Sequence, residues 1–115
     1  MRLQSGSDFI ESFAVHAGLK LALRHRVYKN NPRARKSAER LVATLEGSRS
    51  TYGRQLKMLQ MMQSGATIQA LGKGLRCSRR PVFRYLNHLE SAGVEIELSG
   101  ETYRVDRRLL ATLGA

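Results

Sequence analysis

The sequence predicts a mainly α-helical fold that ends in a small β-hairpin. Two observations carry this prediction. Apolar residues recur at helical spacing in successive segments as far as about residue 92, and Gly or Pro residues separate most of these segments. After Gly93 the period changes to two: Val94, Ile96 and Leu98 alternate with glutamates, and Ser99-Gly100 then turns the chain back.

The first predicted helix runs from Ser7 to about Tyr28. Ser7 or Asp8 is expected to cap it, and basic residues crowd its last turns, where positive charge suits the helix dipole. Its apolar residues form two stripes, which predicts burial on more than one side, for example against a second copy of the chain. The stripes are Phe9, Phe13, Ala17 and Leu21, and Val15, Leu19, Leu23 and Val27.

A second helix is predicted from Arg33 to about Glu46, after the break at Asn30-Asn31-Pro32. The stretch from Gly47 to Gly53 is a second break. Residues 1–50 are therefore interpreted as a helical extension that serves dimerisation or partner binding, and residues 51–115 as a separate module. The face of the second helix expected to be buried consists of Ala34, Ala38, Leu41, Val42 and Leu45.

The second half has three predicted helices before the hairpin. The first runs from Thr51 to about Ser64, and a short one starts at Thr67. A tight turn at Arg76-Cys77 leads to the third, which Ser78 is expected to cap and which runs to about Ala92. The hairpin's return strand is Thr102 to Val105, and Asp106 is expected to cap a last short helix.

This order of elements is accompanied by a family resemblance. The stretch from residue 54 to 105 reads RQLKMLQMMQSGATIQALGKGLRCSRRPVFRYLNHLESAGVEIELSGETYRV. It resembles the winged helix-turn-helix domains of bacterial transcription regulators of the DeoR and biotin-operon-repressor kind, over residues 51–105 or so. The resemblance implies a DNA-binding fold whose recognition helix begins at Ser78, with the hairpin as its wing. Gly72, Arg76 and Pro81 depart from the family, which usually has Ala, Gly and a hydroxyl residue there.

The residues of the helix at Ser78 support the same interpretation. On a helical wheel Val82, Leu86 and Leu89 point to the core. The opposite face combines arginine, asparagine and phenylalanine, which suit guanine, adenine and the thymine methyl group in the major groove. A merely solvated basic face is the alternative for the arginines. The predicted DNA-binding residues are Ser78, Arg79, Arg80, Phe83, Arg84, Asn87 and, in the wing, Arg104.

The charge of the chain favours a polyanionic partner. Lys and Arg number 20 against 9 Asp and Glu, so the formal net charge is +11. Double-stranded DNA is the leading partner, whereas structured RNA, an anionic membrane surface or an acidic protein are alternatives. No apolar run is long enough for a membrane span, and the single Cys77, interpreted as a buried structural thiol, indicates a reducing compartment. We expect a cytoplasmic protein, associated with the nucleoid if it binds DNA.

No catalytic site, metal site or cofactor is expected, because the chain has no Gly-rich phosphate loop, no Cys or His cluster and no paired carboxylates. His88 is interpreted as a surface histidine. The function predicted from the sequence is a sequence-specific transcriptional regulator, dimeric through its N-terminal helices. The alternative is a small adaptor or inhibitor of a phage or mobile element, with a winged helix that binds a host protein; Phe83 and the acidic hairpin favour it.

Overall fold

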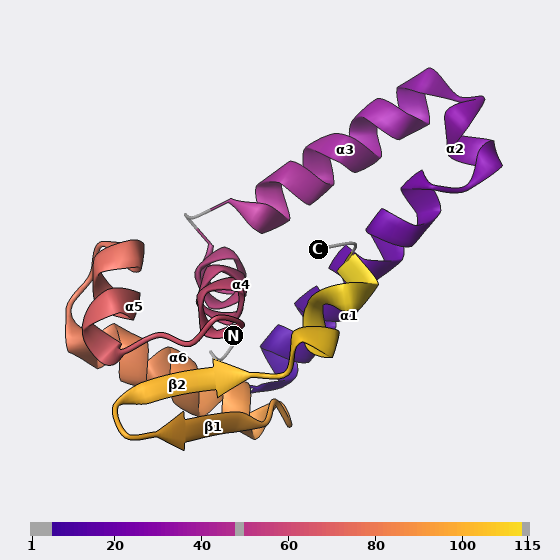
Figure 1. Ribbon diagram of the computed structural model, residues 1–115. Coiled ribbons are helices and arrows are strands. Elements are labelled where there is room, and N and C mark those ends of the chain that lie inside the picture. The colour runs from indigo at the N-terminus through magenta and orange to yellow at the C-terminus, as the bar shows by residue number, and fades with distance from the viewer. Residues whose placement is uncertain (1–5, 48–49, 114–115) are drawn as a thin grey trace.

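The structure is a computed structural model, and it describes residues 6–47 and 50–113 (Figure 1). Mainly helical, it ends in a two-stranded antiparallel hairpin and a 3-10 helix, which confirms the predicted fold class. None of the helices described is long and apolar enough to cross a membrane. The elements are α1 (Gly6–Leu23), α2 (Arg26–Lys29), α3 (Pro32–Glu46), α4 (Thr51–Met62), α5 (Ile68–Leu75), α6 (Arg79–Ser91), β1 (Ile96–Ser99), β2 (Thr102–Val105) and η1 (Arg107–Leu113).

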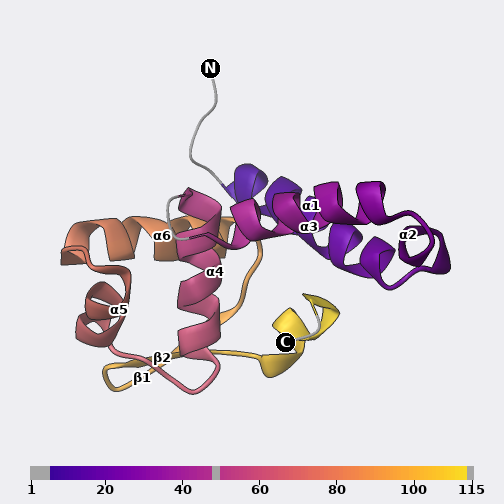
Figure 2. The same cartoon turned by 90° about the horizontal axis from the view of Figure 1, so that it is seen from above.

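Helices α1 and α3 lie side by side and antiparallel, with α2 at the far end, and this unit is called the arm (Figures 1 and 2). The arm makes the molecule elongated, with extents of 50 × 32 × 24 Å. The prediction of one helix through Tyr28 is wrong, because α1 ends at Leu23. The amides of Arg24 and His25 bond three residues back, at 3.1 and 2.9 Å, and these tight turns end the α-helical pattern.

The N-terminal bounds of the arm helices also differ slightly from the prediction. Helix α1 already includes Gly6, one residue before the expected cap at Ser7 or Asp8, whose side chains are outside the described ones. Asn31 caps α3 by accepting the Ala34 amide at 3.1 Å. On α3, Ala38 and Val42 are buried as expected, but Leu41 is 48% exposed and was wrongly assigned to the buried face.

One core joins the arm to the rest of the chain. Phe9 of α1 is buried with Tyr52 of α4, their ring centroids 5.6 Å apart, and it belongs to the same cluster as Leu59 and Leu89. His16 of α1 is 1% exposed, and its two ring nitrogens lie against Tyr52 and Glu46. The first helix is therefore part of the core around which α4, α5 and α6 pack.

Helices α4, α5 and α6 follow one another in the predicted order. A side-chain hydrogen bond caps the N-terminus of α4 and of α5. Ser50 accepts the Gly53 amide at 2.8 Å, and Thr67 accepts the Ala70 amide at 3.1 Å. Ser78 occupies the cap position of α6 in extended conformation, but its side chain makes no cap hydrogen bond, contrary to the prediction.

Two residues that depart from the family resemblance, Gly72 and Arg76, lie at the turn between α5 and α6. Arg76 has φ 56° and ψ 47°, the left-handed conformation that glycine adopts most easily. A Cβ on Gly72 would lie 3.0 Å from the carbonyl oxygen of Cys77, so glycine permits the close approach of this turn to α5. Arginine therefore stands where the backbone favours glycine, and glycine stands where space is short.

Strand β1 begins at Ile96, two residues after Val94, where the alternating pattern starts. The Val94 amide is instead bonded to the Leu89 carbonyl at the end of α6. Ile96 pairs with Val105 and Ser99 with Thr102. An isolated bridge, with hydrogen bonds of 3.0 and 2.8 Å between Ala66 and Tyr103, attaches β2 to the segment before α5. The hairpin is thus held against the helices.

Candidate nucleic-acid interface

Helix α6 has one buried and one exposed face, as predicted. Val82 and Leu89 are fully buried and Leu86 is 4% exposed, so the inner face belongs to the core. The outer face consists of exposed side chains, and with Phe83 42% exposed it presents an aromatic ring to solvent between basic groups. The exposed predicted site residues on this helix and at its start are Ser78, Arg79, Arg80, Phe83, Arg84 and Asn87.

Arg84 is partly held in place by Tyr85, a residue to which the sequence assigned no role. The Arg84 guanidinium carbon lies 5.4 Å from the centroid of the Tyr85 ring, a cation–π geometry. Tyr85 is 3% exposed, and its hydroxyl accepts a hydrogen bond from Arg54 of α4 at 3.2 Å. This bond raises the pKa of Arg54 above its usual value. The guanidinium of Arg54, which stays charged at physiological pH, lies beside α6.

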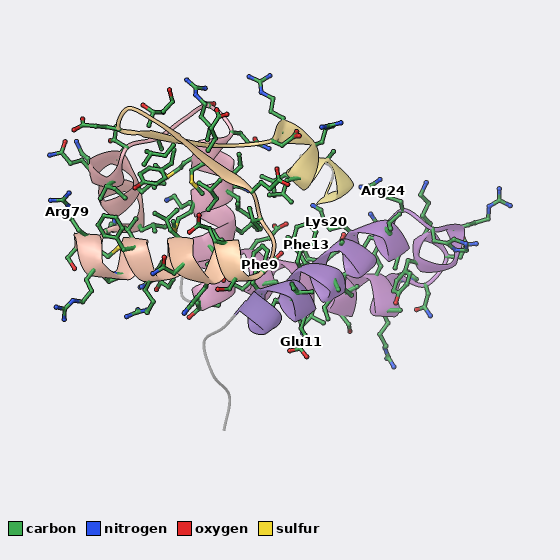
Figure 3. The ribbon with its side chains drawn as sticks, turned by 90° about the horizontal axis from the view of Figure 1, so that it is seen from below. Phe9, Glu11, Phe13, Lys20, Arg24 and Arg79 are labelled. Carbon is green, nitrogen blue, oxygen red and sulfur yellow. The ribbon has the colours of Figure 1, made fainter. Side chains whose placement is uncertain are left out.

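The N-terminal end of α6 concentrates groups that favour an anion. The first amides of a helix lack helical partners, and the dipole there is positive. Arg79 and Arg80 are exposed at this end (Figure 3 labels Arg79). Pro81 lies in the first turn, where a missing amide hydrogen costs no helical bond.

A groove of about 460 Å³ lies between α6, the start of α5 and the hairpin. Arg79 and Phe83 line its α6 side, and Leu98, which is 55% exposed, lines the hairpin side. The sequence did not single out the α5 residues of this groove, although the cap at Thr67 indicates a helix start there. The remaining lining residues are Thr67, Ile68, Gln69, Gly100, Glu101 and Tyr103.

Arg104 lies apart from the other predicted site residues. Successive strand residues point to opposite faces, and Tyr103 lines the groove, so Arg104 points to the other side of the hairpin. Its guanidinium donates to the Ser64 carbonyl at 3.3 Å, and it borders a second hollow with Glu95 and Glu97. The structure therefore brings six of the seven predicted residues together and leaves Arg104 outside.

Two further residues near α6 differ from expectation. His88 is half-buried, and its Nδ1 atom is buried without a hydrogen-bond partner among the described residues, so it is not a surface histidine. Cys77 is only partly buried, although it packs against the core. Within residues 6–47 and 50–113, no three His, Cys, Asp or Glu residues are grouped to hold a metal ion.

Comparisons with protein-family models, with curated proteins and with solved structures find no match to this chain.

Proposed function

We propose that this chain is a sequence-specific DNA-binding regulator of transcription, of the winged helix-turn-helix kind, that inserts α6 into the major groove. One observation carries the proposal: α6 buries Val82 and Leu89 fully and exposes Arg80, Arg84 and Asn87 on its outer face. The net charge of +11 supports a polyanionic partner. The proposed place of action is the cytoplasm, on the nucleoid.

The chemistry of the outer face indicates which contacts to expect. Arginine forms paired hydrogen bonds with guanine, and asparagine does so with adenine, whereas phenylalanine contacts the thymine methyl group. We assign the guanine contacts to Arg80 and Arg84, the adenine contact to Asn87, and the apolar contact to Phe83. Arg79, at the N-terminal end of α6, is assigned to a phosphate.

Selection from a random DNA pool tests this function. The full chain is expected to enrich one motif, and Arg80→Ala/Arg84→Ala should lose most of the preference for it, because each good base contact contributes about 1–3 kcal/mol of discrimination. Lys57→Ala/Arg107→Ala is the matched control, since both residues are exposed and lie outside α6. An unchanged preference in the α6 double variant would contradict the assignment of these arginines.

Self-association through the arm is part of the proposal. Both long helices of the arm expose apolar side chains: Ile10, Val15 and Leu21 of α1 are 51%, 52% and 60% exposed, and Leu41 of α3 is 48% exposed. A dimer would select a two-fold symmetric motif with half-sites about 34–36 Å apart, or a multiple of that distance. Light scattering of the wild type and of Leu21→Gln measures the association directly. A wild type that is monomeric at high concentration would contradict self-association through the arm.

A second candidate function is an adaptor or inhibitor, of the kind that phages and mobile elements encode, that binds a host protein. The groove between α6 and the hairpin favours it, because Phe83 and Leu98 are exposed on its walls beside the acidic Glu101. Such a protein would co-purify with a stoichiometric partner and would bind no DNA at about 0.1 M salt, where nonspecific DNA affinity is measurable. Phe83→Ala would then release the partner.

A further inference from the structure

The end of the arm carries a concentration of positive charge that is separate from the arginines of α6. Between Lys20 and Arg40 the chain has eight basic residues and one acidic residue, Glu39. The local formal charge is therefore 8 − 1 = +7, which is more than half of the total of +11.

Little of this charge is neutralised within the protein. Arg35 pairs with Glu39 at 3.3 Å, and Lys20 lies 3.6 Å from Glu46. In the part of the chain that the structure describes, the other basic residues of this region are exposed and have no ion pair. We call the following five residues the arm tip: Arg24, Arg26, Lys29, Arg33 and Lys36.

The positive electrostatic potential at the arm tip comes from charged side chains rather than from helix dipoles. Helix α1 ends there, with the negative end of its dipole, and α3 begins there, with the positive end, so the two contributions oppose each other. A hollow of about 570 Å³ lies among Arg24, His25, Arg26 and Lys29. A phosphate group placed there would face several cations at once.

The arm tip lies at the opposite end of the molecule from the start of α6. Figures 2 and 3 show α6 and α1 following one another along the same long side, with Arg79 at one end and α2 at the other. The long axis measures 50 Å. Since a base pair rises about 3.4 Å, that length corresponds to about 15 base pairs, or about one and a half turns of B-DNA.

We propose that the arm tip is a second DNA-binding surface, which contacts backbone phosphates up to about one and a half turns beyond those next to α6, without regard to sequence. This inference rests on the proposed function, because it assumes that α6 holds the DNA. Charge complementarity supports it: an extended polyanion is the partner that can meet two positive surfaces at opposite ends of one molecule. The arm tip would then add affinity, and α6 would add specificity.

Salt dependence tests the number of phosphates contacted. Arg26→Gln/Lys29→Gln should make the negative slope of log K against log salt shallower, by about 0.9 for each lost phosphate contact. The duplex used has about 30 base pairs and contains the selected motif. Both side chains are exposed on the short α2, so the variant should fold, which circular dichroism checks. Lys57→Gln/Arg107→Gln removes the same charge elsewhere and should change the slope less. Equal slopes for the two variants would overturn the inference.

Duplex length tests the position of the second surface. The wild type should bind the motif at least several-fold more tightly in a duplex of about 30 base pairs than in one of about 12, which is too short to reach both surfaces. The arm-tip variant should lose this gain and keep its preference for the motif over a scrambled sequence. A wild-type affinity that is the same for both lengths would contradict the proposal.

The outcomes separate this inference from the proposed function. If no duplex is bound at about 0.1 M salt, the proposed function fails. If the motif is bound specifically and neither length nor the arm-tip variant matters, only the second surface fails. A third measurement uses vesicles of phosphatidylcholine with added phosphatidylserine. If the arm-tip variant loses binding to these vesicles while the salt dependence of its DNA binding stays unchanged, the surface binds anionic lipid and the inference is overturned.

Discussion

The Nδ1 atom of His16 lies 2.7 Å from the hydroxyl oxygen of Tyr52, across the junction of α1 and α4. The other ring nitrogen, Nε2, lies 2.9 Å from a carboxylate oxygen of Glu46, which can only accept, so Nε2 donates there. Burial, and then the charge of Glu46, raise the pKa of Tyr52 above its ordinary value, so its hydroxyl keeps its proton. Both ring nitrogens of His16 thus have a hydrogen-bond partner, and the residue connects α1, α3 and α4 at one point.

Tyr52→Phe should therefore destabilise the protein. It removes the partner of the buried Nδ1 atom of His16, and a buried polar atom left without a partner costs about 1–3 kcal/mol. Urea unfolding followed by circular dichroism measures the change in the free energy of unfolding. Tyr103→Phe is the matched control, because the Tyr103 hydroxyl makes no hydrogen bond within the described residues. An equal loss in both variants would contradict a specific role for the pair.

Two glycines should respond in opposite ways to substitution by alanine. A Cβ on Gly53 would collide with the backbone of Gly47, so Gly53→Ala must shift the connection into α4 and should lose about 1–3 kcal/mol of stability. A Cβ on Gly18, in the interior of α1, would meet nothing within 4 Å. Gly18→Ala should gain about 0.5–1 kcal/mol from helix propensity. Thermal unfolding of both variants checks the signs.

Arg76→Gly should stabilise the fold. Arg76 adopts the left-handed conformation, which costs a residue with a Cβ about 1–2 kcal/mol. Glycine removes this strain but has more freedom in the unfolded chain, so the net gain should be below that range. Arg76→Val should instead lower the melting temperature, because a β-branched residue fits this conformation worst. If the glycine variant melts at a lower temperature than the valine variant, this account of the turn is wrong.

The stability that Asp106 contributes at the start of η1 should depend on pH only within a narrow acidic range. Asp106 accepts hydrogen bonds from the Arg108 guanidinium and then from the Arg108 backbone amide, and these lower its pKa from 3.8 to about 2. Because the folded pKa is the lower one, the contribution of Asp106 to stability is complete above about pH 4. It declines as the pH falls from there towards 2.

Comparison with Asp106→Asn measures this contribution. The difference in melting temperature from the wild type should be constant above about pH 4 and should shrink between pH 4 and 2. An NMR titration of the Asp106 carboxyl carbon should give a midpoint near 2. A midpoint near 4 would show that the pair with Arg108 does not persist in solution.

The part of the fold that follows Thr51 is largely predictable from the sequence. Helix α6 has a strict apolar stripe, and Gly93, which follows the helix, has φ 93°, so pattern and backbone agree. The cap at Thr67 is likewise local chemistry that a sequence displays. Ser78 also has the right residue type at the right position, but whether its hydroxyl bonds to the helix depends on a side-chain rotation that no pattern encodes.

The arm was harder to predict because its structure depends on tertiary contacts. From Leu19 to Val27 the apolar stripe continues without Pro or Gly, so nothing in the sequence marks the break at Arg24 and His25. The Leu23 carbonyl freed at that break accepts from Arg35 of α3 at 3.3 Å. His16 gave no signal either, since its partners lie 36 and 30 residues away. The exposure of the predicted residues on α6 follows from its apolar stripe, whereas the position of Arg104 depends on the hairpin register, which no pattern displays.

The attachment of β2 to Ala66 leaves the hairpin with one open side. Strand β2 pairs with β1 and, at Tyr103, with Ala66, whereas within the described residues β1 has no partner on its outer side. Unpaired strand edges invite aggregation between copies, and charged side chains discourage it. The exposed Glu95 and Glu97 supply such charge at this edge. The acidic hairpin of a basic protein can thus be understood as protection of its solubility.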